Sequence, residues 1–185
     1  SRLFGFILGP GGLGEHKYME LTADIIDEYR NTGGFDMIGS GRTKLERREQ
    51  FDKGLEILKE LGISALVIIG GDGSLTGGSL LSKETGMPIV GLPGTIDNDV
   101  WGMDYTIGCD TACNTIVDAI NKLRDTASAH RRIIIVEVMG RHSGWLAMMS
   151  GIAGGAEYIL VPEVTFDLED VSQELKAMYE RGKRY

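Results

Sequence analysis

The sequence predicts an α/β fold with three αβα layers, in which helices cover both faces of a mostly parallel, Rossmann-like sheet. Short apolar runs rich in β-branched residues alternate with longer amphipathic segments along the chain. This alternation is typical of parallel sheets built from β–α–β units. The chain also holds 27 glycines among 185 residues, about twice the usual share. Because glycine serves where backbone turns sharply or approaches a ligand, we expect ligand-binding loops between the elements.

Hydrophobic periodicity places the individual elements. Continuous apolar runs, typical of strands buried on both faces, predict strands at 3–8, 65–69, 88–92, 133–138 and 158–161. Amphipathic spacing predicts helices at 18–30, 49–61, 74–84, 113–127, 143–153 and 170–181. Glycines 33, 34 and 62 follow the first two helices and are expected to end them.

Composition narrows the possible partners. With 19 basic and 27 acidic residues the net charge is −8, which argues against binding nucleic acid or an anionic membrane. No apolar run approaches the roughly 20 residues that span a bilayer, and we recognise no secretory signal. Cys109 and Cys113 lack the further ligands of a zinc site. Two reduced cysteines favour a cytoplasmic protein.

Three loops directly follow predicted strands and are the candidate sites. They cover residues 70–74 (GGDGS), 93–99 (PGTIDND) and 139–141 (MGR). Ligands of α/β sheets bind at the carboxyl ends of the strands. We therefore expect the three loops to meet in one crevice.

Each loop has a functional and a structural interpretation. Glycines 70, 71 and 73, at the start of a helix, suit a phosphate, and Asp72 could hold Mg²⁺; alternatively Asp72 or Ser74 caps a tight turn. Asp97 and Asp99 could divide the roles of base and metal ligand, or form an acidic turn. Arg141 and Arg132 could bind phosphate, or be solvated side chains.

Other motifs are set aside. Residues 9–14 (GPGGLG) match G-x-G-x-x-G, but Glu15, His16 and Lys17 intervene before the next predicted helix, so we interpret the segment as a flexible structural loop. The chain has no P-loop motif, and its three histidines lack metal-binding spacing.

The chain resembles the phosphofructokinase family in several motifs that follow one another in the family's order. They are GGDGS (70–74), PGTIDND (93–99), YTIGCDTA (105–112), LRDT (123–126), RRIIIVEVMGR (131–141), SGIAGGAEYILVPE (150–163) and RGKR (181–184), with GSGR (39–42) upstream. The resemblance covers most of the chain after Ala65. It implies that residues 1–185 are a partial phosphofructokinase domain, most of the nucleotide-side lobe, without its first strand and without the second lobe.

The resemblance implies ATP-dependent phosphorylation of the 1-hydroxyl of fructose 6-phosphate in glycolysis. Asp97 would be the general base, with Thr95 and Arg141 as its catalytic partners. The implied metal ligands are Asp72 and Asp99, for Mg²⁺. The implied nucleotide site is Arg42, Gly71, Asp72, Gly73 and Ser74. The implied sugar-phosphate site is Thr95, Ile96, Asp97, Arg132, Met139, Gly140 and Arg141, with Arg132 reaching across a subunit boundary. The implied effector site is Arg124, Gly155, Glu157, Arg181, Lys183 and Arg184.

The implied function leaves two alternatives, one in the identity of the phosphoryl donor and one in whether the protein is catalytic. Pyrophosphate-using members typically carry aspartate at the position of Gly73 and lysine at that of Gly94, so this chain favours ATP. Residues 33–46, however, resemble pyrophosphate-dependent members. A non-catalytic regulatory homologue is the third hypothesis. We expect a homo-oligomer, dimer or tetramer, with ATP or ADP as donor, product or effector, and an isolated fragment without activity.

Overall fold

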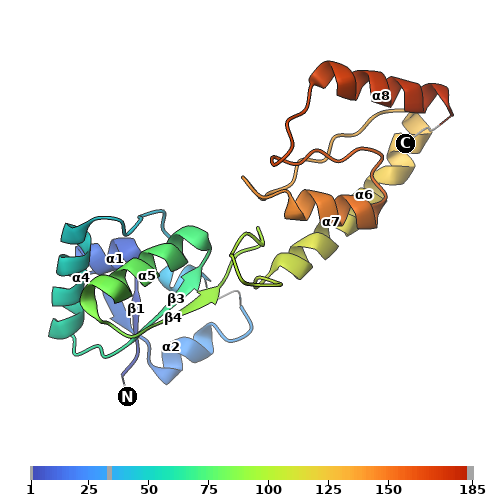
Figure 1. Cartoon of the computed structure of the whole chain (residues 1–185). Helices are drawn as coiled ribbons and strands as arrows, with labels where there is room; N and C mark the ends of the chain where they lie inside the picture. The colour runs from blue at the N-terminus through green and yellow to red at the C-terminus, as the bar shows by residue number, and fades with distance from the viewer. Residues whose placement is uncertain (1, 33–34, 183–185) are drawn as a thin grey trace. The chain divides into compact units, whose positions relative to one another are not determined.

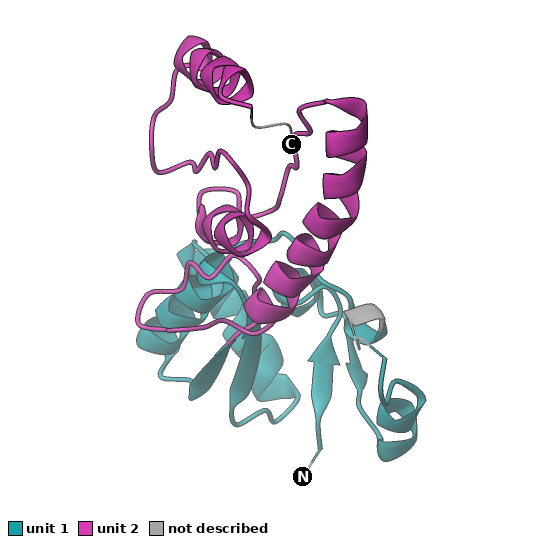
Figure 2. Cartoon of the chain, turned by 90° about the vertical axis from the view of Figure 1, so that its right-hand side faces the viewer, with its two compact units in different colours: residues 1–92 teal, residues 93–185 magenta. Residues whose placement is uncertain are grey.

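The computed structural model describes residues 2–32 and 35–182. The chain divides into two compact units, residues 1–92 and residues 93–185, coloured separately in Figure 2. The first unit holds the described strands together with helices α1 to α5, and the second holds helices α6, α7 and α8 joined by loops (Figure 1).

The first unit opens with a short antiparallel hairpin. β1 (Phe4–Phe6) pairs with β2 (Tyr18–Glu20), and Phe6 stands opposite Tyr18. The prediction of a helix from residue 18 is therefore wrong at its start, because residues 18–20 provide β1 with its hydrogen-bonding partner. The helix α2 (Ala23–Glu28) begins only where the Thr22 hydroxyl accepts a hydrogen bond from the Ile25 N–H, at 3.4 Å.

The glycine-rich segment after β1 is a short helix, α1 (Pro10–Glu15), and the prediction of a flexible loop is wrong. Gly12 and Leu13 are buried within it. A Cβ on Gly12 would lie 2.7 Å from the carbonyl oxygen of Lys17 and would overlap that of Ile7. The glycines thus let α1 lie against the ends of the hairpin strands.

A parallel β–α–β unit follows, and here the predictions are confirmed within three residues. α4 (Arg48–Glu60) precedes β3 (Leu66–Gly70), α5 (Asp72–Thr85) and β4 (Ile89–Pro93). β3 and β4 are neighbours in one sheet, and α5 packs on β3 and on α4. A short helix, α3 (Phe35–Ile38), was not predicted.

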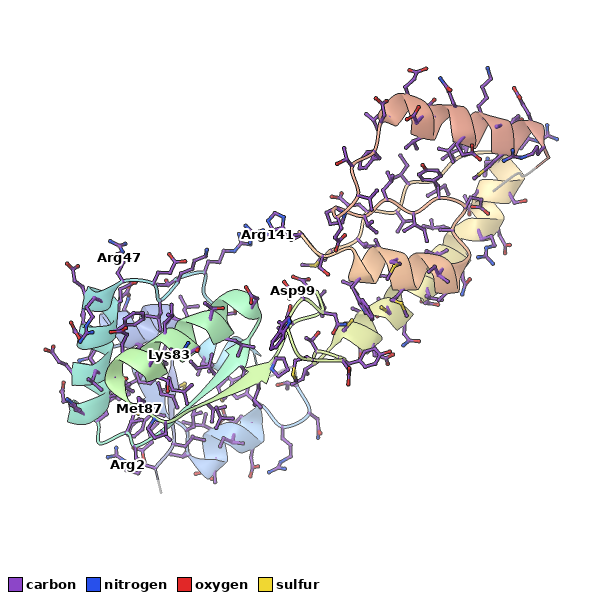
Figure 3. The ribbon with its side chains drawn as sticks, in the orientation of Figure 1. Arg2, Arg47, Lys83, Met87, Asp99 and Arg141 are labelled. Atoms are coloured by element: carbon purple, nitrogen blue, oxygen red, sulfur yellow. The ribbon has the colours of Figure 1, made fainter. Side chains whose placement is uncertain are left out.

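The core of the first unit is apolar and joins these elements. Its buried side chains come from α1, α4, α5 and the loops between them (Met87 is labelled in Figure 3). They are Leu13, Leu45, Phe51, Ile57, Leu58, Leu81 and Met87. These side chains pack against Leu66 and Ile89, the first residues of β3 and β4.

The second unit is built on α6 (Cys109–His130), α7 (Trp145–Gly154) and α8 (Leu168–Glu180). All three helices were predicted, although α6 begins four residues earlier than expected. α6 and α7 pack together, and a Cβ on Gly154 would lie 2.8 Å from Ile120 Cδ1. No helix in the described parts of the chain is long and apolar enough to cross a membrane.

Two predicted strands of the second unit are not formed. Residues 133–138 and 158–161 are neither helix nor strand among the residues that the structure describes. Ile135 is 89% exposed and Ile133 66% exposed. An apolar run favours a buried strand, but a strand needs a hydrogen-bonded neighbour, and no described strand pairs with either segment.

Close packing at Gly12 gives a first prediction. Gly12→Ala should lower the free energy of unfolding by about 1–3 kcal/mol, because the new methyl group would overlap two backbone carbonyls. Gly14→Ala is the matched control in the same helix, where a Cβ meets no atom within 4 Å. Urea unfolding followed by circular dichroism measures both. Equal midpoints for the two variants would contradict the packing described for α1.

Candidate active site

The loop after β4 carries the two candidate aspartates and is held by neutral groups. The Thr95 hydroxyl accepts a hydrogen bond from the Asp97 N–H at 3.3 Å. Asn98 adopts a left-handed backbone conformation, with φ of 51°. Its side-chain oxygen accepts from the Thr106 N–H at 2.8 Å, and its amide donates to the Asp104 carbonyl at 3.2 Å. The loop is therefore shaped without using the carboxylates of Asp97 and Asp99.

The pKa of the Asp97 carboxyl lies above its ordinary value. The main cause is burial, since the side chain is half-buried, and the like charge of Asp99 adds to it. The positive charge of Arg141 acts in the opposite direction and lowers the pKa. A half-buried carboxylate with raised proton affinity suits a general base.

Arg141 lies in a tight turn between residue 140 and α7. Gly140 has φ of 136°, and Arg141 itself has φ of 55°. The Ser143 N–H donates to the Gly140 carbonyl at 2.8 Å and closes the turn. A Cβ on Gly140 would overlap the Ser143 carbonyl oxygen, so this turn needs glycine. The Arg141 side chain is exposed and forms no ion pair within residues 2–32 and 35–182 (Figure 3).

The structure brings part of the expected sugar-phosphate site together. The Ser143 hydroxyl donates to the Asp97 carbonyl at 2.8 Å, which joins the 93–99 loop to the turn of Gly140 and Arg141. Ile96 packs beside Gly108. Met139, next to the turn, is 72% exposed. Arg132 is exposed at the far end of this segment, where its N–H closes the end of α6.

The candidate phosphate loop lies in the first unit. Gly71 begins α5, and its carbonyl accepts from the N–H groups of Ser74 and Leu75 at 3.0 and 3.1 Å. No side chain caps this helix start, so the alternative of a turn capped by Asp72 or Ser74 is wrong. A Cβ on Gly73 would meet no atom within 4 Å. Uncapped N–H groups at the start of a 14-residue helix suit an anion. Arg42 of the same unit is exposed.

Asp72 and Asp99 are the candidate metal ligands. Both are exposed, and neither has an ion-pair partner among the described residues. The described parts of the chain hold no cluster of three acidic, histidine or cysteine groups that could enclose a metal. Mg²⁺ is usually held by one or two carboxylates together with waters and substrate phosphates. Each exposed carboxylate, Asp72 in the first unit and Asp99 in the second, is of the ligand type that Mg²⁺ takes.

Of the expected effector residues, the structure joins two. The Arg124 guanidinium donates to the Gly154 carbonyl, and a Cβ on Gly155 would lie 3.0 Å from Arg124 Nη2. Gly155 ends α7 with φ of 70°. Arg181 instead pairs with Glu174 at 3.2 Å. Glu157 is half-buried, and Lys183 and Arg184 lie outside the described residues.

Three contributors were missed by the sequence analysis. Asn98 and Ser143 hold the aspartate loop, and Glu163 accepts a hydrogen bond from the Gly144 N–H at 2.7 Å. Asn98 stands between two aspartates, a position where an Asx hydrogen bond could have been expected. The Ser143 and Glu163 bonds cross 46 and 19 residues of sequence, and no local pattern signals them.

The fold and these loops define an α/β protein with a phosphate-type helix start and a carboxylate–arginine site. Comparison with known proteins gives the family. A family model described as phosphofructokinase matches residues 1–185, and the chain belongs to this family.

The relatives give the scale of the similarity. An ATP-dependent 6-phosphofructokinase of Halothermothrix orenii is 50% identical over 179 residues, which cover 97% of this chain and 54% of the relative. That of Bacillus subtilis is 45% identical over 183 residues, 99% of this chain and 57% of the relative. The chain thus spans about half the length of the curated relatives it matches.

Solved structures agree with the fold. The T-state phosphofructokinase of Pichia pastoris aligns with a TM-score of 0.85 at 34% identity, over 99% of this chain and 22% of that one. A pyrophosphate-dependent phosphofructokinase of Nitrosospira multiformis aligns with a TM-score of 0.79 at 24% identity, over 98% of this chain and 49% of that one. The α/β fold class predicted from the sequence is confirmed.

Proposed function

We propose that this chain is part of an ATP-dependent 6-phosphofructokinase, which transfers a phosphoryl group from ATP to the 1-hydroxyl of fructose 6-phosphate. Relatives with this name are 45–50% identical to it. The observation that carries the proposal is the half-buried Asp97, whose loop the Ser143 hydroxyl joins to the turn of Arg141 at 2.8 Å. Burial, and then the like charge of Asp99, raise the pKa of the Asp97 carboxyl. The activity belongs to the whole protein that contains this chain.

Phosphoryl transfer places two demands on the protein. The attacking hydroxyl must lose its proton, and the phosphate charge must be neutralised in a fixed geometry. We assign the first task to Asp97. We assign to Arg141 the positioning of the sugar, because it can bind the 6-phosphate through two parallel N–H groups. Thr95 and Ile96 shape the aspartate loop beside them. The base and the ligand of the sugar phosphate are thus assigned to different residues, on two segments that the Ser143–Asp97 hydrogen bond joins.

We assign the nucleotide to residues 71–74 and Arg42. The backbone N–H groups at the start of α5 suit phosphate oxygens, and an arginine adds a charge-assisted contact. Bound Mg²⁺ would neutralise phosphate charge during transfer, with Asp72 and Asp99 as its carboxylate ligands. The absence of a Cβ at Gly73 leaves the surface above the helix start open.

Regulation and assembly are the finer part of the proposal. Arg124 and Gly155 adjoin each other, and we propose them as two members of an effector site for ADP or ATP, together with Glu157, Arg181, Lys183 and Arg184. We also propose a cytoplasmic homo-oligomer in which Arg132 reaches the sugar phosphate of a neighbouring subunit. The exposed side chain of Arg132 is compatible with a contact to a neighbouring subunit. The free thiols of Cys109 and Cys113 are compatible with the reducing cytoplasm.

Replacement of Asp97 tests the assigned base. In the full-length protein, Asp97→Ser should lower kcat about 10²–10⁴-fold, because proton transfer contributes rate enhancement of this order. The KM of fructose 6-phosphate should stay within about threefold, since the binding contacts remain. Asp170→Ser, an exposed aspartate in the first turn of α8, is the control. A coupled enzyme assay measures kcat and KM of both variants. A near-normal kcat in Asp97→Ser would refute the assignment of Asp97 as the general base.

Gly73 gives a separate prediction for the donor. Gly73→Asp puts a carboxylate in the open space beside the start of α5, where it would repel the α-phosphate of ATP. A partly desolvated like-charge contact costs about several kcal/mol, so kcat/KM for ATP should fall at least about 100-fold. The ratio of kcat/KM for ATP and pyrophosphate is measured before and after the change. Wild-type preference for pyrophosphate would overturn the donor assignment, and undiminished ATP use would exclude Gly73 as the discriminating position.

A further inference from the structure

We propose that Ser143 is a positioning residue for the reaction, which holds the loop of Asp97 in register with the turn of Arg141. The inference rests on the proposed function, because it concerns the rate of the same phosphoryl transfer. The hydrogen bonds of Ser143 that the structure describes go to backbone and to neither of the two assigned side chains. It acts through the backbone that carries them.

The geometry around the hydroxyl is specific. Ser143 Oγ donates to the Asp97 carbonyl at 2.8 Å, although the two residues are 46 apart in sequence. The same oxygen accepts from the Trp145 N–H at 3.4 Å. The side chain is half-buried. One hydroxyl therefore bridges the aspartate loop and the first residue of α7.

The same residue also closes the arginine turn. The Ser143 N–H donates to the Gly140 carbonyl at 2.8 Å, with Arg141 inside the turn. Ser143 thus links the two assigned groups, by its side chain on one side and by its backbone on the other.

The position of Ser143 is itself anchored. The N–H of the next residue, Gly144, donates to Glu163 Oε1 at 2.7 Å. A Cβ on Gly144 would lie 2.5 Å from Val161 Cβ, so the backbone here approaches the 161–163 segment closely. With its neighbour held in this way, the hydroxyl of Ser143 provides a defined support for the Asp97 loop.

Loss of this hydroxyl should affect the chemical step more than substrate binding. The Asp97 carbonyl would lose its partner while it stays part-buried, which favours a shifted loop. A base that is displaced by a fraction of an ångström costs rate, because transfer requires close alignment with the attacking hydroxyl. The contacts of Arg141 and of the nucleotide loop do not depend on this hydroxyl.

The experiment compares three variants of the full-length protein. Ser143→Ala removes the hydroxyl, and Ser143→Thr keeps one at the same position. Ser150→Ala is the matched control, because Ser150 is buried in α7 and its hydroxyl donates only to the Leu146 carbonyl of the same helix. Steady-state kinetics with ATP and fructose 6-phosphate gives kcat and KM. Hydrogen exchange of the peptide that covers residues 95–99 measures how well the aspartate loop is held, and this measurement does not require enzymatic activity.

In Ser143→Ala we expect kcat to fall about tenfold, with both KM values within about twofold. Exchange over residues 95–99 should be faster. Ser143→Thr should recover kcat to within about threefold of the wild type, and Ser150→Ala should match the wild type in kinetics and exchange.

Two results would overturn the inference: unchanged kcat and exchange in Ser143→Ala, or equal losses in Ser143→Ala and Ser143→Thr. A wild-type protein that transfers no phosphoryl group would overturn the proposed function instead. In that case the exchange measurement still judges the contact. Faster exchange in Ser143→Ala supports it, and unchanged exchange refutes it.

Discussion

The candidate site depends on one unfavourable arrangement, the half-buried Asp97 carboxylate beside a second carboxylate, Asp99. Burial of an ionised group and a like charge nearby both cost free energy, and a loop left free would relax by turning Asp97 into solvent. Neutral groups prevent this. The Asn98 amide and the Ser143 hydroxyl bind backbone on either side of the loop. Within residues 2–32 and 35–182 the carboxylate has no hydrogen-bonded or ion-pair partner, which leaves it available to accept a proton.

The segments that hold the Asp97 loop are connected to the packed helices of the second unit. The turn of Arg141 leads into α7, whose small residues permit close contacts behind it. A Cβ on Gly151 would lie 2.8 Å from Ile159 Cδ1, and one on Gly154 equally close to Ile120 Cδ1. Glycines therefore serve helix packing here, a role that the sequence analysis did not predict for them.

Much of the fold followed from the sequence, and the errors have physical causes. α4 and α5 were predicted because an amphipathic spacing and flanking glycines define them locally. The hairpin strand Tyr18–Glu20 was missed because its apolar spacing also fits a helix, and pairing with β1 decides between the two. Residues 133–138 are apolar enough for a strand, but strand formation depends on a neighbour that local sequence does not specify.

The candidate site, like the fold, could be predicted from the sequence only in part. Asp97, Asp99 and Arg141 were predicted from motifs that resemble those of a known family, and the comparisons confirm the family. Asp97 and Asp99 lie in the loop after β4, whereas the strand predicted before Arg141 is not formed. Their proximity within the second unit could not be derived locally. It depends on Ser143, whose bond to Asp97 spans 46 residues.

The most direct test of this account is the pKa of the Asp97 carboxyl, measured by a ¹³C NMR titration of the labelled full-length protein. The account predicts a value above the ordinary aspartate value of about 3.9. It also predicts a fall in Asp99→Asn, which removes the like charge, and a rise in Arg141→Gln, which removes the opposite one. An Asp97 carboxyl that titrates at or below its ordinary value, and does so equally in both variants, would contradict it.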